Sequence, residues 1–156
     1  MRNAIGMIGL AFGLVLSACG ETGDRVDQFV GTWRPVSGTV RKDCPGAVPT
    51  TENAVRDVLW SAGVKSDLVS TTPLTPCRLK ADVANGTAFG LPDDKCTQSD
   101  GAGGTSTVIF NRYTFAVSLD GRTATESAAG QITRVDRSVA TGCSFEATAS
   151  YQKIGE

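Results

Sequence analysis

The sequence predicts an all-β fold, an antiparallel meander of about eight strands, on three observations. Threonine, serine, valine and glycine are abundant while leucine and glutamate are scarce, which is typical of strands and turns. Several stretches alternate apolar and polar side chains, the pattern of a strand with one buried face. Turn residues recur at short intervals between these stretches. A β-sandwich is the alternative architecture.

The N-terminus has the features of an export signal. Arg2 precedes an uncharged apolar stretch at residues 4–16, and two small residues then lead to a cysteine. The stretch is too short to serve as a permanent membrane helix. Residues 1–18 are therefore predicted to be a signal peptide.

The end of this stretch, Leu-Ser-Ala-Cys at residues 16–19, resembles the bacterial lipobox. In that motif the cysteine is acylated and the signal is cut before it, which implies that Cys19 is the lipid attachment site. Two or three acyl chains would hold the protein on a membrane, because each buried CH₂ contributes about 0.8 kcal/mol. The alternative is an ordinary signal peptide with a chance cysteine near its cleavage site.

The residues after Cys19 bear on the membrane and on the tether. In lipoprotein sorting, an aspartate after the cysteine signals retention in the inner membrane. Gly20 occupies that position here, so by analogy we expect a cell-envelope protein of the outer membrane. Residues 19–28 then comprise the lipidated cysteine and a polar, flexible tether.

Length and charge limit the domain count and the partners of the mature chain. Residues 29–156 are predicted to form a single β domain, because the mature chain is long enough for one core and too short for two. Arg2 leaves with the signal, so 14 basic and 16 acidic residues remain. This balance, without a Lys/Arg cluster, argues against a nucleic-acid partner.

The domain is expected to open with a strand at residues 30–42. An ambiguous element comes next, at residues 53–61. Its apolar residues have helical spacing, but Trp60 and the turn residues around it favour a strand. We expect a strand there.

Residues 77–83 alternate strictly and lead through Asn85-Gly86 into a second short strand. A two-residue turn would place Phe89 on the polar face, opposite Asp82. A three-residue loop sets Phe89 on the apolar face, because a one-residue slip exchanges the two faces of a strand. We therefore expect the three-residue loop.

A long strand is expected at residues 109–119. Asp120-Gly121 then turns the chain into residues 122–127, and residues 132–135 continue that strand after a kink at Gly130. The inward side chains of the long strand would be Tyr113, Phe115, Val117 and Leu119.

The last strand, at residues 143–152, has the clearest alternation. Its odd-numbered residues are apolar and the even-numbered ones polar, so one face is buried and the other is wet. The buried face would carry Cys143, Phe145, Ala147, Ala149 and Tyr151.

Four cysteines remain beside the lipidated one, namely Cys44, Cys77, Cys96 and Cys143. An even number in an exported chain predicts two disulfides, with three connectivities open. The rival interpretation, a Cys₄ metal site, is disfavoured because no C-x₂-C pair is present and the compartment is oxidising.

Strand geometry favours one connectivity. The hairpin, followed by a bend at Pro92, brings Cys96 back to Cys77. If the first and last strands are neighbours, the end of one lies beside the start of the other, which pairs Cys44 with Cys143. That register would also set Val40 against Ala147 and Val36 against Tyr151.

Residues 29–33, Phe-Val-Gly-Thr-Trp, resemble the Gly-x-Trp opening of lipocalin-type barrels. In those proteins the tryptophan plugs one end of the barrel. The resemblance implies that the meander closes as a lipocalin-like barrel with Trp33 at one end. The alternative is that Trp33 is an ordinary core residue at a strand start.

Residues 29–156 also resemble small uncharacterised lipoproteins of the kind numerous in myxobacteria. That family implies a lipid-anchored, cysteine-containing β domain without an established activity. The matching pieces are FVGTW (29–33), SDLV (66–69), the cysteine-flanked hairpin (77–96), YTFAVSLDGRTATES (113–127) and CSFEATASYQK (143–153).

The chain has no histidine, which excludes triads that need an imidazole base and zinc sites with histidine ligands. Neither a cofactor nor a metal is expected, although Asp93, Asp94 and Asp100 form an acidic loop that could be read as a calcium site. The loop does not fit EF-hand spacing, and a solvated loop is the preferred interpretation.

Three function classes remain. The first is a non-enzymatic, membrane-anchored envelope lipoprotein with a structural or interaction role and an envelope protein as partner. The second binds a small apolar ligand in a cavity lined by Trp33, Phe110, Phe115 and Tyr151. The third is a hydrolase, which would need two carboxylates to meet in one cleft. Its candidates are Asp67, Asp93, Asp94, Asp100 and Glu126.

Overall fold

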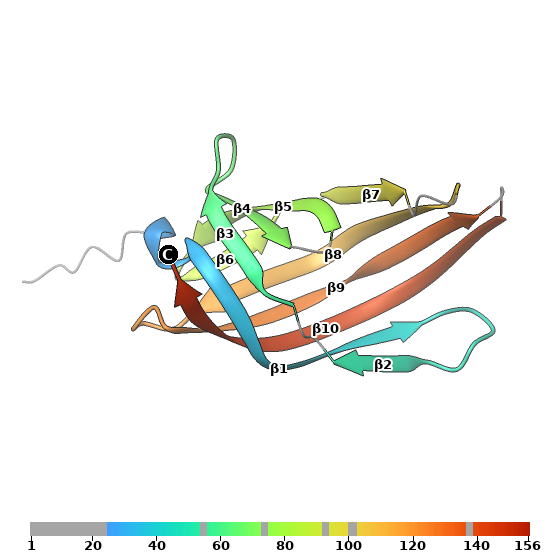
Figure 1. The fold of residues 1–156 in the computed structure, drawn as a ribbon, viewed down its shortest axis with the longest axis horizontal. Helices are drawn as coiled ribbons and strands as arrows, with labels where there is room; N and C mark the ends of the chain where they lie inside the picture. Colours follow the sequence, from blue (N-terminus) through green and yellow to red (C-terminus); the bar gives the residue numbers. More distant parts are fainter. Residues whose placement is uncertain (1–24, 54–55, 73–74, 92–93, 100–102, 137–138) are drawn as a thin grey trace, which may run out of the picture.

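The computed structural model describes residues 25–53, 56–72, 75–91, 94–99, 103–136 and 139–156, without the side chains of residues 72 and 75–77. Within these residues eight strands close into one antiparallel barrel, and two further strands flank it (Figure 1). The barrel strands are β1 (Gly31–Asp43), β3 (Val58–Ala62), β4 (Leu68–Thr72), β5 (Thr75–Ala84), β6 (Thr87–Gly90), β8 (Thr105–Val117), β9 (Thr123–Asp136) and β10 (Val139–Gly155). The flanking strands are β2 (Thr50–Asn53) and β7 (Lys95–Ser99).

The barrel is an up-and-down meander. Each barrel strand pairs antiparallel with the next one along the chain, and β10 returns to pair with β1. Closure pairs each of the eight strands with a neighbour on both sides over at least part of its length. The predicted all-β meander and its lipocalin-like barrel are therefore confirmed, and the sandwich alternative is not adopted.

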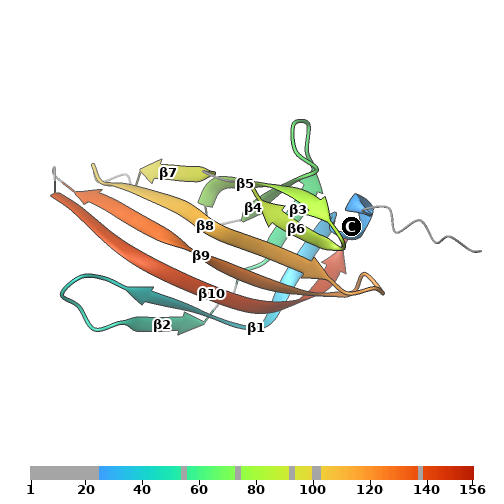
Figure 2. The same cartoon turned by 180° about the vertical axis from the view of Figure 1, so that it is seen from behind.

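The two ends of the barrel differ because the strands differ in length. β10 has 17 residues and β9 has 14, whereas β3 and β4 have five each. The long strands extend past the short ones at one end, where β2 pairs with the second half of β1 and β7 with the first part of β8 (Figures 1 and 2). We call this the open end and the opposite end the closed end.

Aromatic side chains fill the closed end. Trp33, Trp60, Phe115 and Phe29 have no exposed surface. The centroid of the Phe115 ring lies 5.4 Å from that of Trp33 and 5.6 Å from that of Trp60. Such ring contacts stabilise a core beyond the area they bury. As the lipocalin-type resemblance implied, Trp33 lies in the core at one end of the barrel.

A short 3₁₀ turn, η1 (Val26–Gln28), precedes β1 at this end and is tied to the core. The indole N–H of Trp33 donates to the carbonyl of Phe29 at 2.8 Å. The Lys153 ammonium donates to the carbonyl of Gln28 at 3.2 Å and lies 5.6 Å from the centroid of the Trp33 ring. These contacts join the start of the domain to its last strand.

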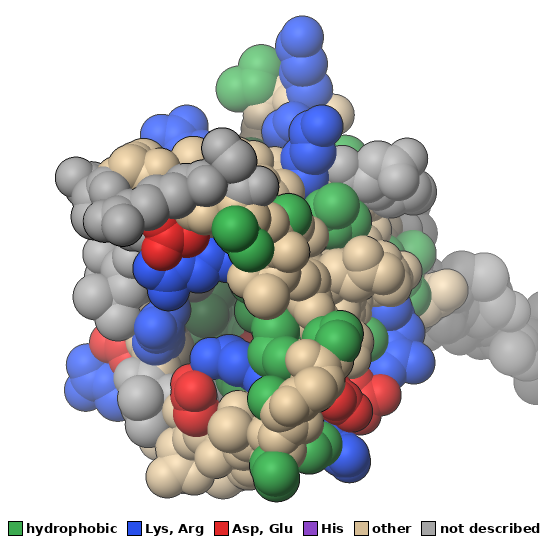
Figure 3. Space-filling model, turned by 90° about the vertical axis from the view of Figure 1, so that its right-hand side faces the viewer, with side chains coloured by type: hydrophobic (Ala, Val, Ile, Leu, Met, Phe, Trp, Pro, Cys, Tyr) green, Lys and Arg blue, Asp and Glu red, His purple; other side chains and the backbone are tan. Residues whose placement is uncertain are grey.

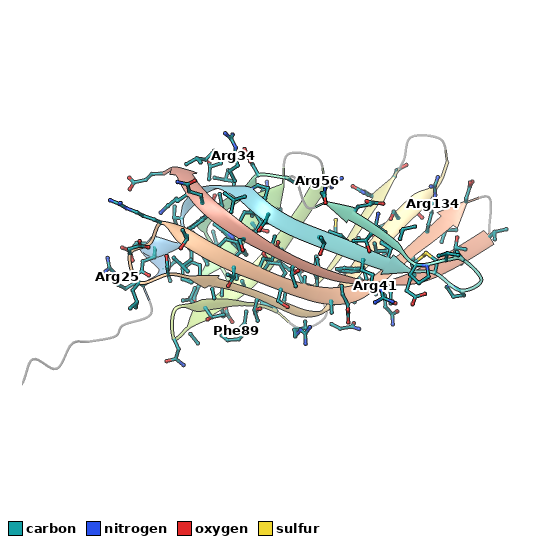
Figure 4. The ribbon with its side chains drawn as sticks, turned by 90° about the horizontal axis from the view of Figure 1, so that it is seen from below. Arg25, Arg34, Arg41, Arg56, Phe89 and Arg134 are labelled. Atoms are coloured by element: carbon teal, nitrogen blue, oxygen red, sulfur yellow. A yellow bond between two sulfur atoms is a disulfide. The ribbon has the colours of Figure 1, made fainter. Side chains whose placement is uncertain are left out.

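The expected three-residue loop between β5 and β6 is wrong. Ala84 pairs with Thr87, which leaves a two-residue turn at Asn85-Gly86 with φ of 51° and 72°. Positive φ at both positions is the type I′ geometry that suits Asn-Gly and the twist of a hairpin. The turn geometry outweighs the burial of Phe89, which is 46% exposed on the outer surface (Figure 4).

Two predicted core positions are exposed instead. Leu119 is fully exposed because β8 ends at Val117 and residues 118–122 form a turn. In that turn the Asp120 carboxylate accepts the hydroxyl of Ser118 at 2.6 Å. A bulge after Pro35 shifts the register of β1, so that Pro35 rather than Val36 faces Tyr151. Proline lacks the N–H that a regular ladder needs, which explains the irregularity.

Two other strand predictions have mixed outcomes. Val40 pairs with Ala147 as expected. The strand expected at residues 53–61 is confirmed only for residues 58–61, which belong to β3, because residue 53 ends β2 and residues 56–57 lie in no strand. The two runs expected on either side of Gly130 form one strand, β9, and the irregularity in this ladder lies in the partner strand β8, between Phe110 and Arg112. A Cβ at Gly130 would collide with the carbonyl of Ile109 and the ring of Phe145, so only glycine fits this crossing.

Cys44 and Cys143 form a disulfide with a Cα–Cα distance of 4.2 Å, and the predicted pairing is confirmed. The bond joins β1 to β10 at the open end. Cys96 is also disulfide-bonded, but the side chain of Cys77 lies outside the described part, so their pairing stays a prediction. Residues 1–24, with Cys19, lie outside it as well.

Candidate functional site

The barrel contains a cavity of about 500 Å³ that opens at the open end (Figure 3). This volume falls in the range of about 300–1,000 Å³ that is usual for small-molecule sites. Figure 3 views the molecule from this end and shows a hollow with hydrophobic side chains in its depth.

Small side chains create the space. Ala128 on β9 lies directly opposite Ala147 on β10, and Ala149 follows two residues later on the same inward face. Alternate residues of a strand share a face, so these alanines point into the barrel, where they fill less space than the aromatic rings of the closed end. The apolar lining comprises Val40, Val58, Leu79, Val108, Phe110, Tyr113, Ala128, Ile132, Phe145, Ala147 and Ala149.

The cavity is elongated along the strands. Its lining extends from the pair Gln98–Ser106 at the mouth to Glu126, which pairs with Phe115, at the inner level. Along β8 these two levels are about 30 Å apart, and less along the barrel axis because the strands tilt.

A hydrogen-bonded acid lies at the inner level. The Tyr151 hydroxyl donates to Oε2 of Glu126 at 2.7 Å. Burial raises the pKa of Glu126, and the hydroxyls of Tyr151 and Tyr113 partly offset that rise. Burial also raises the pKa of Tyr113 and of Tyr151, and the adjacent Glu126 raises both further. The cluster can exchange hydrogen bonds with a polar group on a ligand.

Charged side chains line the mouth. Four are basic, and the acidic ones are Glu52 and Asp94. The Lys42 ammonium lies 3.0 Å from Oε2 of Glu52 and is paired. Oδ2 of Asp94 accepts the backbone N–H of Lys80 at 2.7 Å. Within the described residues the other three cations, Arg56, Arg78 and Lys95, have no ion pair.

The structure brings together only part of the predicted lining. Phe110 and Tyr151 line the cavity, whereas Trp33 and Phe115 lie in the packed closed end. This corrects the expectation for those two residues, because the ring of Phe115 packs against those of Trp33, Trp60 and Phe29 in the filled core. Sequence reasoning placed Ala147 and Ala149 on an inward face but did not assign them to the cavity lining, and the recurrence of small residues on that face was the signal.

Among the described residues, the carboxylates that could serve a hydrolase, Asp67, Asp94 and Glu126, do not lie together. Asp67 accepts the backbone N–H of Val83 at 2.8 Å and belongs to the β3–β4 turn region. Asp94 and Glu126 both line the cavity but lie at its mouth and its inner level. Asp93 and Asp100 lie outside the described residues. The described part holds no cluster of three potential metal ligands.

No helix among the described residues has the length and hydrophobicity needed to cross a membrane. Comparison with known proteins adds no relative, since no protein-family model, curated protein or solved structure matches the chain. The geometry of the cavity is therefore the basis for a function.

Proposed function

We propose that the protein is a non-enzymatic lipoprotein of the cell envelope, anchored through Cys19, whose barrel binds a small apolar ligand. The observation that carries the proposal is the open, alanine-lined cavity of about 500 Å³. Among the classes that the sequence suggests, a role confined to the outer surface needs no such cavity. A ligand binder needs one.

The energetics favour an occupied cavity. An apolar surface that faces water inside a barrel costs free energy, and a ligand that covers it recovers about 25 cal/mol per Å² of apolar area. The walls of the cavity are mostly aliphatic and aromatic carbon, so most of a bound ligand would contact apolar atoms.

The direction of the mouth agrees with a tethered binder. The described chain starts with η1 at the closed end (Figure 1), and the cavity opens at the opposite end (Figure 3). Figure 4 shows Arg25 near the closed end and Arg134 near the open end. A lipid on Cys19 would therefore place the closed end next to the membrane and leave the mouth accessible from the aqueous side.

The test uses the full chain in polymer-bounded lipid nanodiscs, which contribute no tryptophan. Prodan, a small neutral fluorophore, accepts energy from tryptophan, and Trp60 and Trp33 lie below the cavity. We expect saturable, tryptophan-sensitised prodan emission. Ala147→Leu should weaken binding about tenfold because the larger side chain obstructs the cavity.

Thr148→Leu is the matched control, since Thr148 is the next residue on β10 and is exposed on the outer face. It should bind prodan as the natural chain does. Equal prodan affinity in the natural chain and in Ala147→Leu would place the probe outside the barrel. That result would refute the binding function and leave the surface role of an envelope lipoprotein.

A further inference from the structure

The shape of the cavity favours an elongated ligand. Its lining extends along the strands from the Gln98–Ser106 pair at the mouth to Glu126 and Tyr151 at the inner level. The apolar lining extends from Val108 near the mouth to Ala149 at the inner level, so contact with carbon is available along its length. An extended apolar chain satisfies both conditions.

The charge at the mouth selects the end group of that chain. The lining has four basic and two acidic residues at this level, an excess of positive charge in a protein whose formal net charge is −1. Arg56 precedes β3, Arg78 lies in β5 and Lys95 begins β7, so the three unpaired cations reach the mouth from three segments. Figure 3 shows Lys and Arg side chains around the hollow.

An anion at the mouth would relieve the repulsion among these cations. Carboxylate and phosphate oxygens accept charge-assisted hydrogen bonds from guanidinium and ammonium groups. The low dielectric of the apolar wall behind the mouth strengthens this attraction. A neutral end group would leave the cations as they are, and a cationic one would add to their repulsion.

The inner level sets the orientation. Oε2 of Glu126 already accepts the Tyr151 hydroxyl, and no basic side chain lines this part of the cavity among the described residues. An anionic end group placed here would lie beside an acidic side chain in an apolar surrounding, which is unfavourable. The apolar end of the ligand fits this level, and the anionic end fits the mouth.

We infer that the cavity ligand is an anionic amphiphile with an extended apolar chain, bound with its carboxylate or phosphate at Arg56, Arg78 and Lys95 and its chain inside the barrel. This inference rests on the proposed function, because it names the class of ligand for the same cavity. A free fatty acid and a phosphate-headed lipid share this chemistry.

The experiment compares four ligands with the same chain in displacing prodan from the full protein in neutral nanodiscs. They are laurate, dodecyl phosphate, dodecanol and dodecylamine. Laurate and dodecyl phosphate should displace prodan at about tenfold lower concentration than the alcohol or the amine. The better of the two anions identifies the source as a free acid or a phosphate lipid. Added salt should reduce this preference.

The variant Arg56→Gln/Arg78→Gln/Lys95→Gln should lose the preference for anions and keep its affinity for dodecanol. The control, Arg41→Gln/Arg112→Gln/Arg122→Gln, removes the same charge from exposed residues outside the cavity lining and should retain the preference. Circular dichroism checks that both variants fold.

Equal displacement by the alcohol and the acids, or an anion preference that survives in the first variant, would overturn the inference while leaving the apolar binder intact. Failure of every ligand to displace prodan would overturn the inference and also remove support for the proposed function. The two failures are therefore distinguishable.

Discussion

The closed and open ends of the barrel are built from the same strands but differ in the size of their inward side chains. At the closed end, Trp33, Trp60 and Phe115 fill the interior completely. At the open end, the paired residues Ala128 on β9 and Ala147 on β10 lie side by side on the inward face and leave a cavity in front of them. Because strand number and tilt fix the width of a barrel, side-chain size decides which level is core and which is binding site.

The difference predicts an unequal division of stability, which can be tested by removing one aromatic ring from each end. Trp33→Ala should lower the free energy of unfolding by about 3–5 kcal/mol, because the change leaves a void in a packed core. It also removes the hydrogen bond to Phe29. Phe110→Ala should cost about 1–2 kcal/mol, since one side of that ring already faces the cavity. Urea unfolding followed by circular dichroism measures both values.

A third variant removes a phenylalanine ring from the outer surface and shows whether the cost depends on where the ring lies. Phe89→Ala removes a ring that is 46% exposed on the outer surface and should change stability by less than about 0.5 kcal/mol. If Trp33→Ala and Phe110→Ala cost the same, the two ends would share one continuous core. The contrast between a packed end and a hollow end would then be wrong.

Enlarging a side chain should affect the stability of the fold differently at the two ends. Ala124 is 3% exposed in the packed region, and Ala124→Leu should destabilise the fold by about 1–3 kcal/mol through overpacking. Ala147→Leu should leave stability unchanged or raise it by up to about 1 kcal/mol, because the added carbons enter existing space.

Thermal unfolding of both variants beside the natural chain tests this contrast. A loss of stability in Ala147→Leu as large as that in Ala124→Leu would mean that the cavity walls cannot accommodate a larger side chain. The space in front of Ala128 and Ala147 would then be too small for a ligand.

The sequence predicts the meander and the Cys44–Cys143 bond because both depend on local alternation and on which strands meet. The two-residue turn at Asn85-Gly86 was missed because two local preferences conflict there. Burial of Phe89 favours one register and the backbone of Asn-Gly favours the other, and only the assembled hairpin shows that the turn dominates.

The sequence suggested a ligand cavity on the basis of four aromatic residues, and only Phe110 and Tyr151 among them line it. Aromatic residues suggested a binding site, yet Trp33 and Phe115 pack against other rings and fill space. Alternation shows that Ala147 points inward, but it does not show how far the opposite wall lies. That distance depends on barrel closure, which involves strands far apart in the chain.

The smallest expected effect concerns the acid between the two ends. Burial raises the pKa of Glu126 above its ordinary value of 4.5, so the folded state holds this proton more tightly than the unfolded state. The stabilising contribution of the protonated form is present below pH 4.5 and is lost as the pH rises through the folded-state pKa. Glu126→Gln has no carboxyl to titrate at this position. The difference in stability between the variant and the natural chain should therefore favour the variant more at neutral pH than at pH 4.

The gain at neutral pH should stay below about 1 kcal/mol, because glutamine keeps an oxygen that accepts the Tyr151 hydroxyl. Thermal unfolding of both chains from pH 4 to pH 8 measures it. Glu146→Gln, on the exposed face of β10, removes the same charge away from the cavity and is the control. If the stability of Glu126→Gln changes with pH in parallel with that of the natural chain, the carboxyl has the same pKa in the folded and unfolded states. The inner level would then be as wet as the mouth, and the apolar end of a ligand would have no reason to prefer it.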